Sequence, residues 1–103
     1  MASVLWSEPA VEQLLLIRKS SLRSRVYRAV GGLAKFPLRG RRPPEVSRFP
    51  DLELPADLRE LVFPRVSRLF YLYDESKDVV RVLGMTFRGK EVGPDWFQHL
   101  LEQ

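Results

Sequence analysis

The side chains best suited to bind phosphate gather in one segment of this 103-residue chain. Ten Lys or Arg residues and a single acid, Glu45, fall between Arg18 and Arg48, so the segment carries a charge of +9 in a chain of net charge +4. Such a concentration favours a polyanionic partner, and nucleic acid is the commonest one. Arg outnumbers Lys by 13 to 4, and its planar fork suits phosphate oxygens. A solvated helix face is the alternative explanation of the charge.

Composition argues against several other kinds of site. The chain has no cysteine, which excludes disulfides, thiolate metal sites and cysteine nucleophiles. A single histidine, His99, argues against a zinc or transition-metal site, and we expect no cofactor. The longest apolar run near the N-terminus covers residues 14–17, far short of a signal sequence or a membrane span. We therefore expect a cytoplasmic protein with no membrane partner.

The elements that position these residues begin with a strand and two helices. At this length we expect one domain, residues 1–103. The apolar residues 4–6 predict a short strand, and Ser7 followed by Pro9 predicts a helix start. Helical spacing breaks at residues 20–21, and a second helix is expected from about Leu22 until Pro37 ends it. The second helix places an apolar stripe on one face: Val26, Ala29, Val30, Leu33 and Phe36.

The second half of the chain predicts a β-sheet. From Pro37 to Pro55, frequent prolines exclude long regular structure, and a connection of this length is functional or mobile. Three β-like runs follow at residues 58–63, 67–73 and 79–87, the last two joined by a polar turn. The order predicts an α+β fold, in which an N-terminal α-hairpin packs on one face of a small, mainly antiparallel sheet.

These elements and their residues resemble the RelE/ParE toxin superfamily. The resemblance extends over nearly the whole chain, and its specific part is residues 58–90. There Leu-Arg-Glu-Leu-Val, Arg-Leu-Phe-Tyr-Leu-Tyr-Asp and Val-Arg-Val-Leu-Gly-Met-Thr-Phe-Arg-Gly-Lys follow one another in the order typical of the family. The resemblance implies a growth-inhibiting toxin of a type II toxin–antitoxin pair, neutralised by a protein antitoxin encoded beside it.

Members of the superfamily have one of two activities, which act on different targets. RelE-like members cleave messenger RNA, commonly at the ribosome, whereas ParE-like members inhibit DNA gyrase and cleave nothing. Cleavage of RNA requires the 2′-hydroxyl to attack the neighbouring phosphorus, so a site must move protons and stabilise a doubly charged phosphorane. RelE-like sites resemble a ring of Arg and Lys with a Tyr or a His. We favour the RNA-cleaving, metal-independent activity.

Carried over to this chain, the resemblance assigns catalytic roles to four residues. Arg59 and Arg88 match arginines of the first and last β-runs, and Lys90 and His99 are the proton-transfer candidates. The expected nucleic-acid-binding residues are Arg39, Arg41, Arg42, Arg48, Arg68 and Trp96. Trp96 would stack on a base.

Each assignment has a structural alternative. Arg59, which precedes Glu60, fits a solvent-facing strand position, and Arg68 fits a brace for the sheet or for the antitoxin site. Lys90 fits an ordinary surface residue. Trp96 and Leu100 are four residues apart, the spacing of a helical turn docked on the sheet. Gyrase inhibition remains the main alternative function, and a nucleic-acid-binding module without catalysis is a further one.

Overall fold

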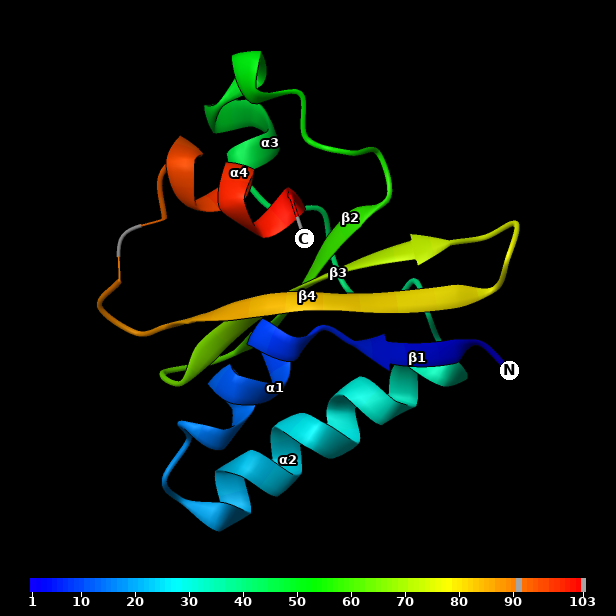
Figure 1. The fold of residues 1–103 in the computed structure, drawn as a ribbon, viewed down its shortest axis with the longest axis vertical. Coiled ribbons are helices and arrows are strands. Elements are labelled where there is room, and N and C mark those ends of the chain that lie inside the picture. The colour runs from blue at the N-terminus through cyan, green and yellow to red at the C-terminus, as the bar shows by residue number, and fades with distance from the viewer. Residues whose placement is uncertain (91, 103) are drawn as a thin grey trace.

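The computed structural model describes residues 1–90 and 92–102 of the chain. Most helices lie in the first part of the chain, after β1, and the strands lie mostly in the C-terminal half, before a last helix (Figure 1). In chain order the elements are β1 (Ser3–Trp6), α1 (Glu8–Leu15), α2 (Ser20–Gly31), η1 (Gly32–Ala34), α3 (Glu45–Arg48), η2 (Pro50–Leu52), β2 (Leu58–Phe63), β3 (Ser67–Asp74), β4 (Val79–Phe87) and α4 (Pro94–Leu101). None of the helices in the described part of the chain has the length and apolar character needed to span a bilayer.

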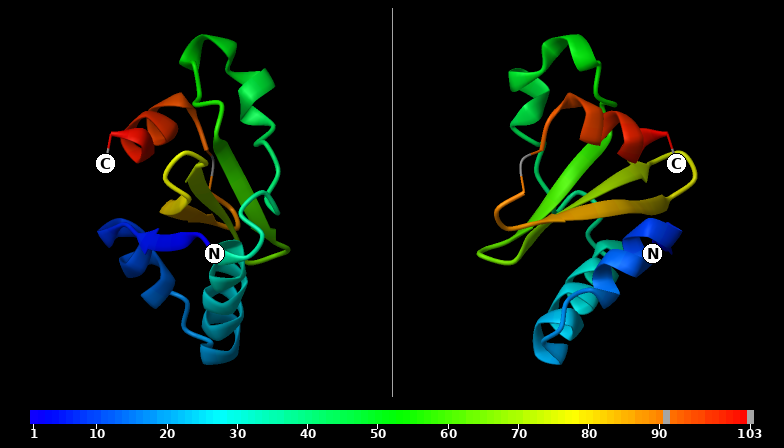
Figure 2. Two further views of the ribbon diagram at one scale, coloured as in Figure 1. Left: turned by 90° about the vertical axis from the view of Figure 1, so that its right-hand side faces the viewer. Right: turned by 60° about the vertical axis from the view of Figure 1, so that its left-hand side comes forward.

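The four strands form one sheet in the order β1-β4-β3-β2. The strands β2, β3 and β4 make an antiparallel meander, while β1 pairs with β4 in parallel. A β-bulge between Phe70 and Tyr71 shifts the register of β3 against β4. Helices cover both faces of this sheet (Figure 2). The predicted α+β class and the mainly antiparallel sheet are confirmed.

The helix pair α1–α2 packs on one face of the sheet, as predicted. Ser7 caps α1: its hydroxyl accepts from the Ala10 N–H at 3.2 Å and donates to the Leu83 carbonyl at 2.8 Å. The predicted start of α2 is wrong by two residues, because Ser20 and Ser21 already belong to the helix. The expected buried stripe is confirmed except at its end, where Phe36 is 58% exposed. Phe36 is exposed because α2 ends at Gly31 and a 3-10 turn redirects the chain.

The opposite face of the sheet is covered by α4. Phe97 and Leu100 pack against the buried side chains of Leu58, Phe70 and Leu83. This second core is separate from the larger one under α1 and α2. The sheet is therefore buried on both sides, which fixes its strands as a rigid platform.

The proline-rich connection is tied to the outer edge of β2 by polar contacts. Arg41 forms a β-bridge with Glu60, and its Nε donates to a Glu60 carboxylate oxygen at 2.8 Å. The Arg42 Nη1 atom donates to three backbone carbonyls that precede or begin β2. The connection therefore has a defined course although it contains little regular structure.

Gly40 passes closest to the sheet. Its N–H donates to the hydroxyl of the fully buried Tyr71 at 2.9 Å, and this hydroxyl donates to the Pro37 carbonyl at 2.8 Å. A Cβ at position 40 would lie 2.6 Å from both the Tyr71 hydroxyl and the Glu60 carbonyl oxygen, so only glycine fits. Burial raises the pKa of Tyr71, and the hydroxyl keeps the proton that it donates.

Candidate functional site

A cleft of about 380 Å³ opens at the end of the sheet where β2 and β4 end and β3 begins. Its walls come from two segments: residues 62–68, which contain the β2–β3 turn, and residues 86–90 with Val92, which follow β4. A backbone hydrogen bond from the Arg88 N–H to the Val66 carbonyl, 3.2 Å long, joins the two segments. Residues far apart in the sequence are thereby held at one end of the sheet.

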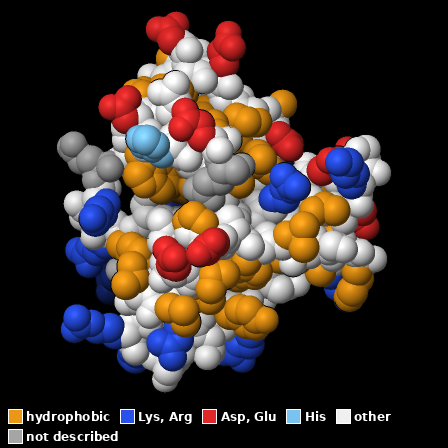
Figure 3. Space-filling model, in the orientation of Figure 1, with side chains coloured by type: hydrophobic (Ala, Val, Ile, Leu, Met, Phe, Trp, Pro, Cys, Tyr) orange, Lys and Arg blue, Asp and Glu red, His pale blue; other side chains and the backbone are white. Residues whose placement is uncertain are grey.

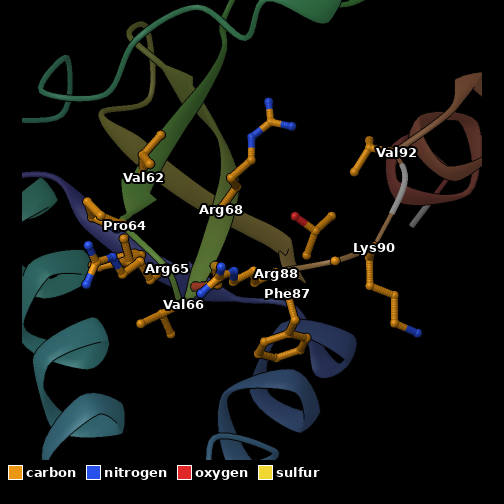
Figure 4. A pocket seen from close by; sticks show the side chains of 13 residues that line it. Val62, Pro64, Arg65, Val66, Arg68, Phe87, Arg88, Lys90 and Val92 are labelled. Carbon is orange, nitrogen blue, oxygen red and sulfur yellow. The ribbon is translucent and has the colours of Figure 1, made fainter.

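Three cations around this cleft have no carboxylate partner among the described residues. They are Arg65, Arg88 and Lys90, which lies two residues after Arg88 (Figure 4). Arg65 adopts a left-handed backbone conformation with φ of 66°, an uncommon one for a residue with a Cβ. Thr86 adds a hydroxyl to the lining. Unneutralised guanidinium and ammonium groups at one cleft can bind a phosphate through charge-assisted hydrogen bonds.

The fourth cation of the cleft, Arg68, is bound by two acids. Its Nη1 and Nη2 atoms donate to the two oxygens of Glu45 at 2.9 and 2.7 Å, and its Nε donates to Glu60 at 2.8 Å. The guanidinium also lies 5.0 Å from the centre of the Phe70 ring. Glu60 is shared with Arg41, so two cations and two anions form one neutral network.

The electrostatics of this network follow from burial and pairing. Burial raises the pKa of Glu45, but the hydrogen bond from Arg68 and one within its own helix lower it, and the net pKa lies below the ordinary value. The hydrogen bond to Glu45 raises the pKa of Arg68, against the effect of burial. Both groups therefore stay charged at neutral pH.

Charges are unevenly distributed over the surface. On the face seen in Figure 3, acidic side chains predominate over the upper part and also lie near the centre, while basic ones lie along the left and lower margins and on the right-hand side. In the described residues, no group of three His, Asp or Glu side chains is arranged to hold a metal ion. The polar side chains that line the cleft carry guanidinium, ammonium and hydroxyl groups.

Comparison with known proteins identifies this architecture. Neither family models nor curated proteins give a match to the sequence. Solved structures do: the RelBE2 toxin–antitoxin complex of Mycobacterium tuberculosis matches with a TM-score of 0.64 at 21% identity, over 84% of this chain and 98% of that one. The isolated RelE toxin of E. coli matches with 0.63 at 13% identity, over 99% and 98%. The chain has the RelE fold.

A further match is the intact RelBE toxin–antitoxin complex of E. coli, with a TM-score of 0.57 at 16% identity, over 87% of this chain and 100% of that chain. These similarities confirm the predicted resemblance at the level of the fold. They extend over nearly all of the sequence, so the RelE fold accounts for the whole α+β arrangement.

On the RelE fold of this chain, the four predicted catalytic residues do not all meet. Arg88 and Lys90 line the cleft. Arg59 does not line it; its Nη1 donates to the Gly40 carbonyl at 2.7 Å, which ties the proline-rich connection to β2. His99 lies on the exposed side of α4, with Nδ1 4.0 Å from a Glu102 oxygen, and does not line the cleft either.

Of the predicted nucleic-acid-binding residues, one lines the cleft. It is Arg68, whose guanidinium is bound by the two acids. Arg41 and Arg42 make the contacts of the proline-rich connection described above. The other three are Arg39 and Arg48, which are exposed, and Trp96, whose ring centre lies 5.3 Å from that of Phe70.

Sequence reasoning missed Arg65 and Thr86 as lining residues. Arg65 lies in the β2–β3 turn, between Pro64 and Val66, where an isolated arginine looks like ordinary turn polarity. Its position at the same cleft as Arg88 follows from the pairing of β2 with β3 and of β3 with β4. A useful signal was present nonetheless, because the strand boundaries place Arg65 and Arg88 at the same end of the meander.

Proposed function

We propose that this chain is the toxin of a type II toxin–antitoxin pair and that it cleaves messenger RNA at the cleft between the β2–β3 turn and the end of β4. The observation that carries the proposal is a group of cations at this cleft, Arg65, Arg88 and Lys90, that have no carboxylate partner among the described residues and lie on a RelE fold. A phosphodiester with its growing negative charge is the ligand that such a group favours.

In the proposed reaction, the 2′-oxygen of one nucleotide attacks the adjacent phosphorus. The bond from phosphorus to the 5′-oxygen of the next nucleotide breaks, leaving a 2′,3′-cyclic phosphate and a 5′-hydroxyl. One proton leaves the 2′-oxygen and one reaches the 5′-oxygen, so acid and base are both needed. Arg88 stabilises the phosphorane through its planar fork, and Lys90 is the proton-transfer candidate that lines the cleft.

The experiment compares Arg88→Ala with Arg81→Ala. Both substitutions remove an exposed arginine, but Arg88 follows β4 and lines the cleft, whereas Arg81 lies within β4 and outside the cleft. Each variant is induced in a bacterial host, growth is followed, and RNA 5′ ends are mapped. Removing one donor to an oxyanion costs about 10²–10³ in rate, so Arg88→Ala is expected to lose cleavage and toxicity. Arg81→Ala is expected to retain both, and an equally toxic Arg88→Ala protein would contradict the assignment.

Inhibition of DNA gyrase is the second candidate function. It is favoured by the lining of the cleft, because none of the described lining residues is a His, Tyr, Asp or Glu that could serve as a conventional base. The same induction experiment separates the two targets. Gyrase-linked DNA breaks with intact messenger RNA would replace the nuclease proposal by this one.

We further infer that a cognate protein antitoxin binds this chain. Two of the similar solved structures are toxin–antitoxin complexes. The α1–α2 surface exposes Val11, Leu15, Leu16 and Tyr27, and a groove of about 630 Å³ lies between the two helices. Exposed apolar residues grouped in this way are typical of an interaction surface. Co-expression with the product of the neighbouring gene should restore growth and yield a complex that co-purifies.

A further inference from the structure

The only acid of the basic segment occupies a buried position. Glu45 is 2% exposed, although ten cations lie around it in the sequence between residues 18 and 48. It belongs to the four-residue helix α3, which lies outside the sheet at the top of the molecule in Figure 1. A buried carboxylate is costly unless it is paired, and its partner here is Arg68 of β3.

The contacts of Arg68 with the two acids engage both the end and one edge of its guanidinium. A guanidinium has five N–H groups. The end formed by Nη1 and Nη2 faces the two Glu45 oxygens at 2.9 and 2.7 Å, and the edge formed by Nε and Nη2 faces one Glu60 oxygen at 2.8 and 2.6 Å. Three of the five N–H groups therefore donate to the two acids, and Nη2 makes a further ion-pair contact with Glu60.

This pairing determines what Arg68 can bind. A guanidinium grips a phosphate through two parallel N–H groups, and Glu45 occupies the end of the fork that would do so. The Arg68 side chain is 25% exposed and lines the cleft, so a ligand in the cleft can reach it once the carboxylate moves away. Glu60 cannot move in the same way, because it lies in the middle of β2 and is also held by Arg41.

We propose that Glu45 masks Arg68 and competes with a nucleic-acid phosphate for its guanidinium fork. The inference rests on the proposed function, because it concerns the same cleft. When a phosphate binds, it replaces the Glu45 carboxylate on Nη1 and Nη2, while Glu60 keeps Arg68 in position through Nε. The released carboxylate becomes solvated, and α3 separates from the sheet.

The masking makes the affinity of the cleft for a nucleic-acid phosphate depend on Glu45, which does not line the cleft. With Glu45 in place, Arg41, Arg68, Glu45 and Glu60 sum to zero charge; without the Glu45 charge they sum to +1. Glu45→Gln keeps the shape of the side chain and removes the competing anion. A matched control is Glu12→Gln, which removes the same charge from an exposed position on α1.

The test measures binding of a short RNA made non-cleavable by a 2′-deoxy substitution. Glu45→Gln is expected to bind it about tenfold more tightly than wild type, the effect of gaining one charge-assisted contact. The salt dependence should steepen by about 0.7 in logarithmic slope, as for one further phosphate contact on a single strand. In an Arg68→Gln background the gain should disappear. If Glu45→Gln binds no better than Glu12→Gln, Glu45 only braces the fold and the proposal is overturned.

A second measurement uses the wild-type protein and does not depend on the folding of a variant. The amides of Ser47, Arg48 and Phe49 bond to carbonyls of Pro44 and Glu45 within α3. Hydrogen exchange at these amides should accelerate when the non-cleavable RNA saturates the protein, because α3 is released. Unchanged or slower exchange would overturn the proposal.

Failure of the proposed RNA-cleaving function can be distinguished from failure of the masking. If RNA fails to bind both wild type and Arg88→Ala, the nuclease assignment falls, and inorganic phosphate then serves as the probe for the masking. The Arg68 Nε–H resonance should shift at about tenfold lower phosphate concentration in Glu45→Gln than in wild type, and equal titrations in the two proteins would overturn the masking. The absence of a shift in both proteins would overturn the masking as well.

Discussion

Replacement of Tyr71 by Phe removes one oxygen atom from the point where the proline-rich connection meets the sheet. The Tyr71 hydroxyl accepts from the Gly40 N–H at 2.9 Å and donates to the Pro37 carbonyl at 2.8 Å. The ring itself is fully buried, and Phe occupies the same space without the hydroxyl. The substitution therefore tests the two hydrogen bonds and leaves apolar packing unchanged.

The expected cost follows from the burial of the two partners. The N–H of the buried Gly40 loses its acceptor, and an unsatisfied buried donor costs about 1–3 kcal/mol. Pro37 is half-buried, so water can replace the bond to its carbonyl at little cost. For a domain of this size, each kcal/mol lowers the melting temperature by about 4–8 °C. We therefore expect Tyr71→Phe to lower the melting temperature by about 4–24 °C relative to wild type.

The control is Tyr73→Phe, which removes the same atom two residues away on β3. The Tyr73 hydroxyl donates to an Asp78 carboxylate oxygen at 2.8 Å, and this bond is exposed to solvent. We expect Tyr73→Phe to melt close to wild type, as measured by circular dichroism under identical conditions. If the Tyr71 and Tyr73 variants melt at the same temperature, the hydroxyl of Tyr71 does not anchor the connection and the reasoning fails.

Three further predictions concern charged residues. The pKa of Glu45 is depressed in the folded protein, so the pairing of Glu45 with Arg68 stabilises the fold fully above the ordinary pKa of 4.5, and this stabilisation is lost as the pH falls below that value. Glu45→Gln should therefore flatten the dependence of the unfolding free energy on acid pH, as measured by urea titrations. Arg59→Ala should lower the melting temperature, because its bond to the Gly40 carbonyl is lost, whereas a catalytic role alone would leave melting unchanged. Arg39→Gln should reduce the logarithmic salt dependence of RNA binding by about 0.7 and leave the melting temperature unchanged, because Arg39 is exposed. Arg42→Gln should instead lower the melting temperature, because Arg42 donates to backbone carbonyls.

The sequence predicted the sheet well, because strand signals are local. Alternating apolar and polar residues bounded by turn residues set β2 at Leu58–Phe63 and β4 at Val79–Phe87, the limits that the structure has. The cap at Ser7 was predictable for the same reason, since the hydroxyl acts within one turn. Long-range pairing made no contribution to these predictions.

The parts that the sequence did not reveal depend on tertiary contacts. Glu45 and Glu60 are buried, yet each looks like an exposed acid when it is considered alone. Their burial is possible only because Arg68 and Arg41 reach them from other elements. Phe36 is the opposite case: its helical spacing predicts burial, but the helix ends before it. Contacts between distant segments determined the burial of the two acids, and the local end of α2 determined the exposure of Phe36.

The positive segment shows why charge along a sequence is an incomplete guide to a binding site. Arg41 and Arg42 contribute two of its ten cations, but both serve internally, one in the ion network and one on backbone carbonyls. Arg65 and Arg88, cleft cations without a carboxylate partner among the described residues, come from the less basic part of the chain. An anion at the cleft would therefore be bound mainly by side chains that the sheet register brings together. The remaining exposed arginines of the segment can contribute long-range attraction, which raises the rate of association more than it fixes the position of a phosphate.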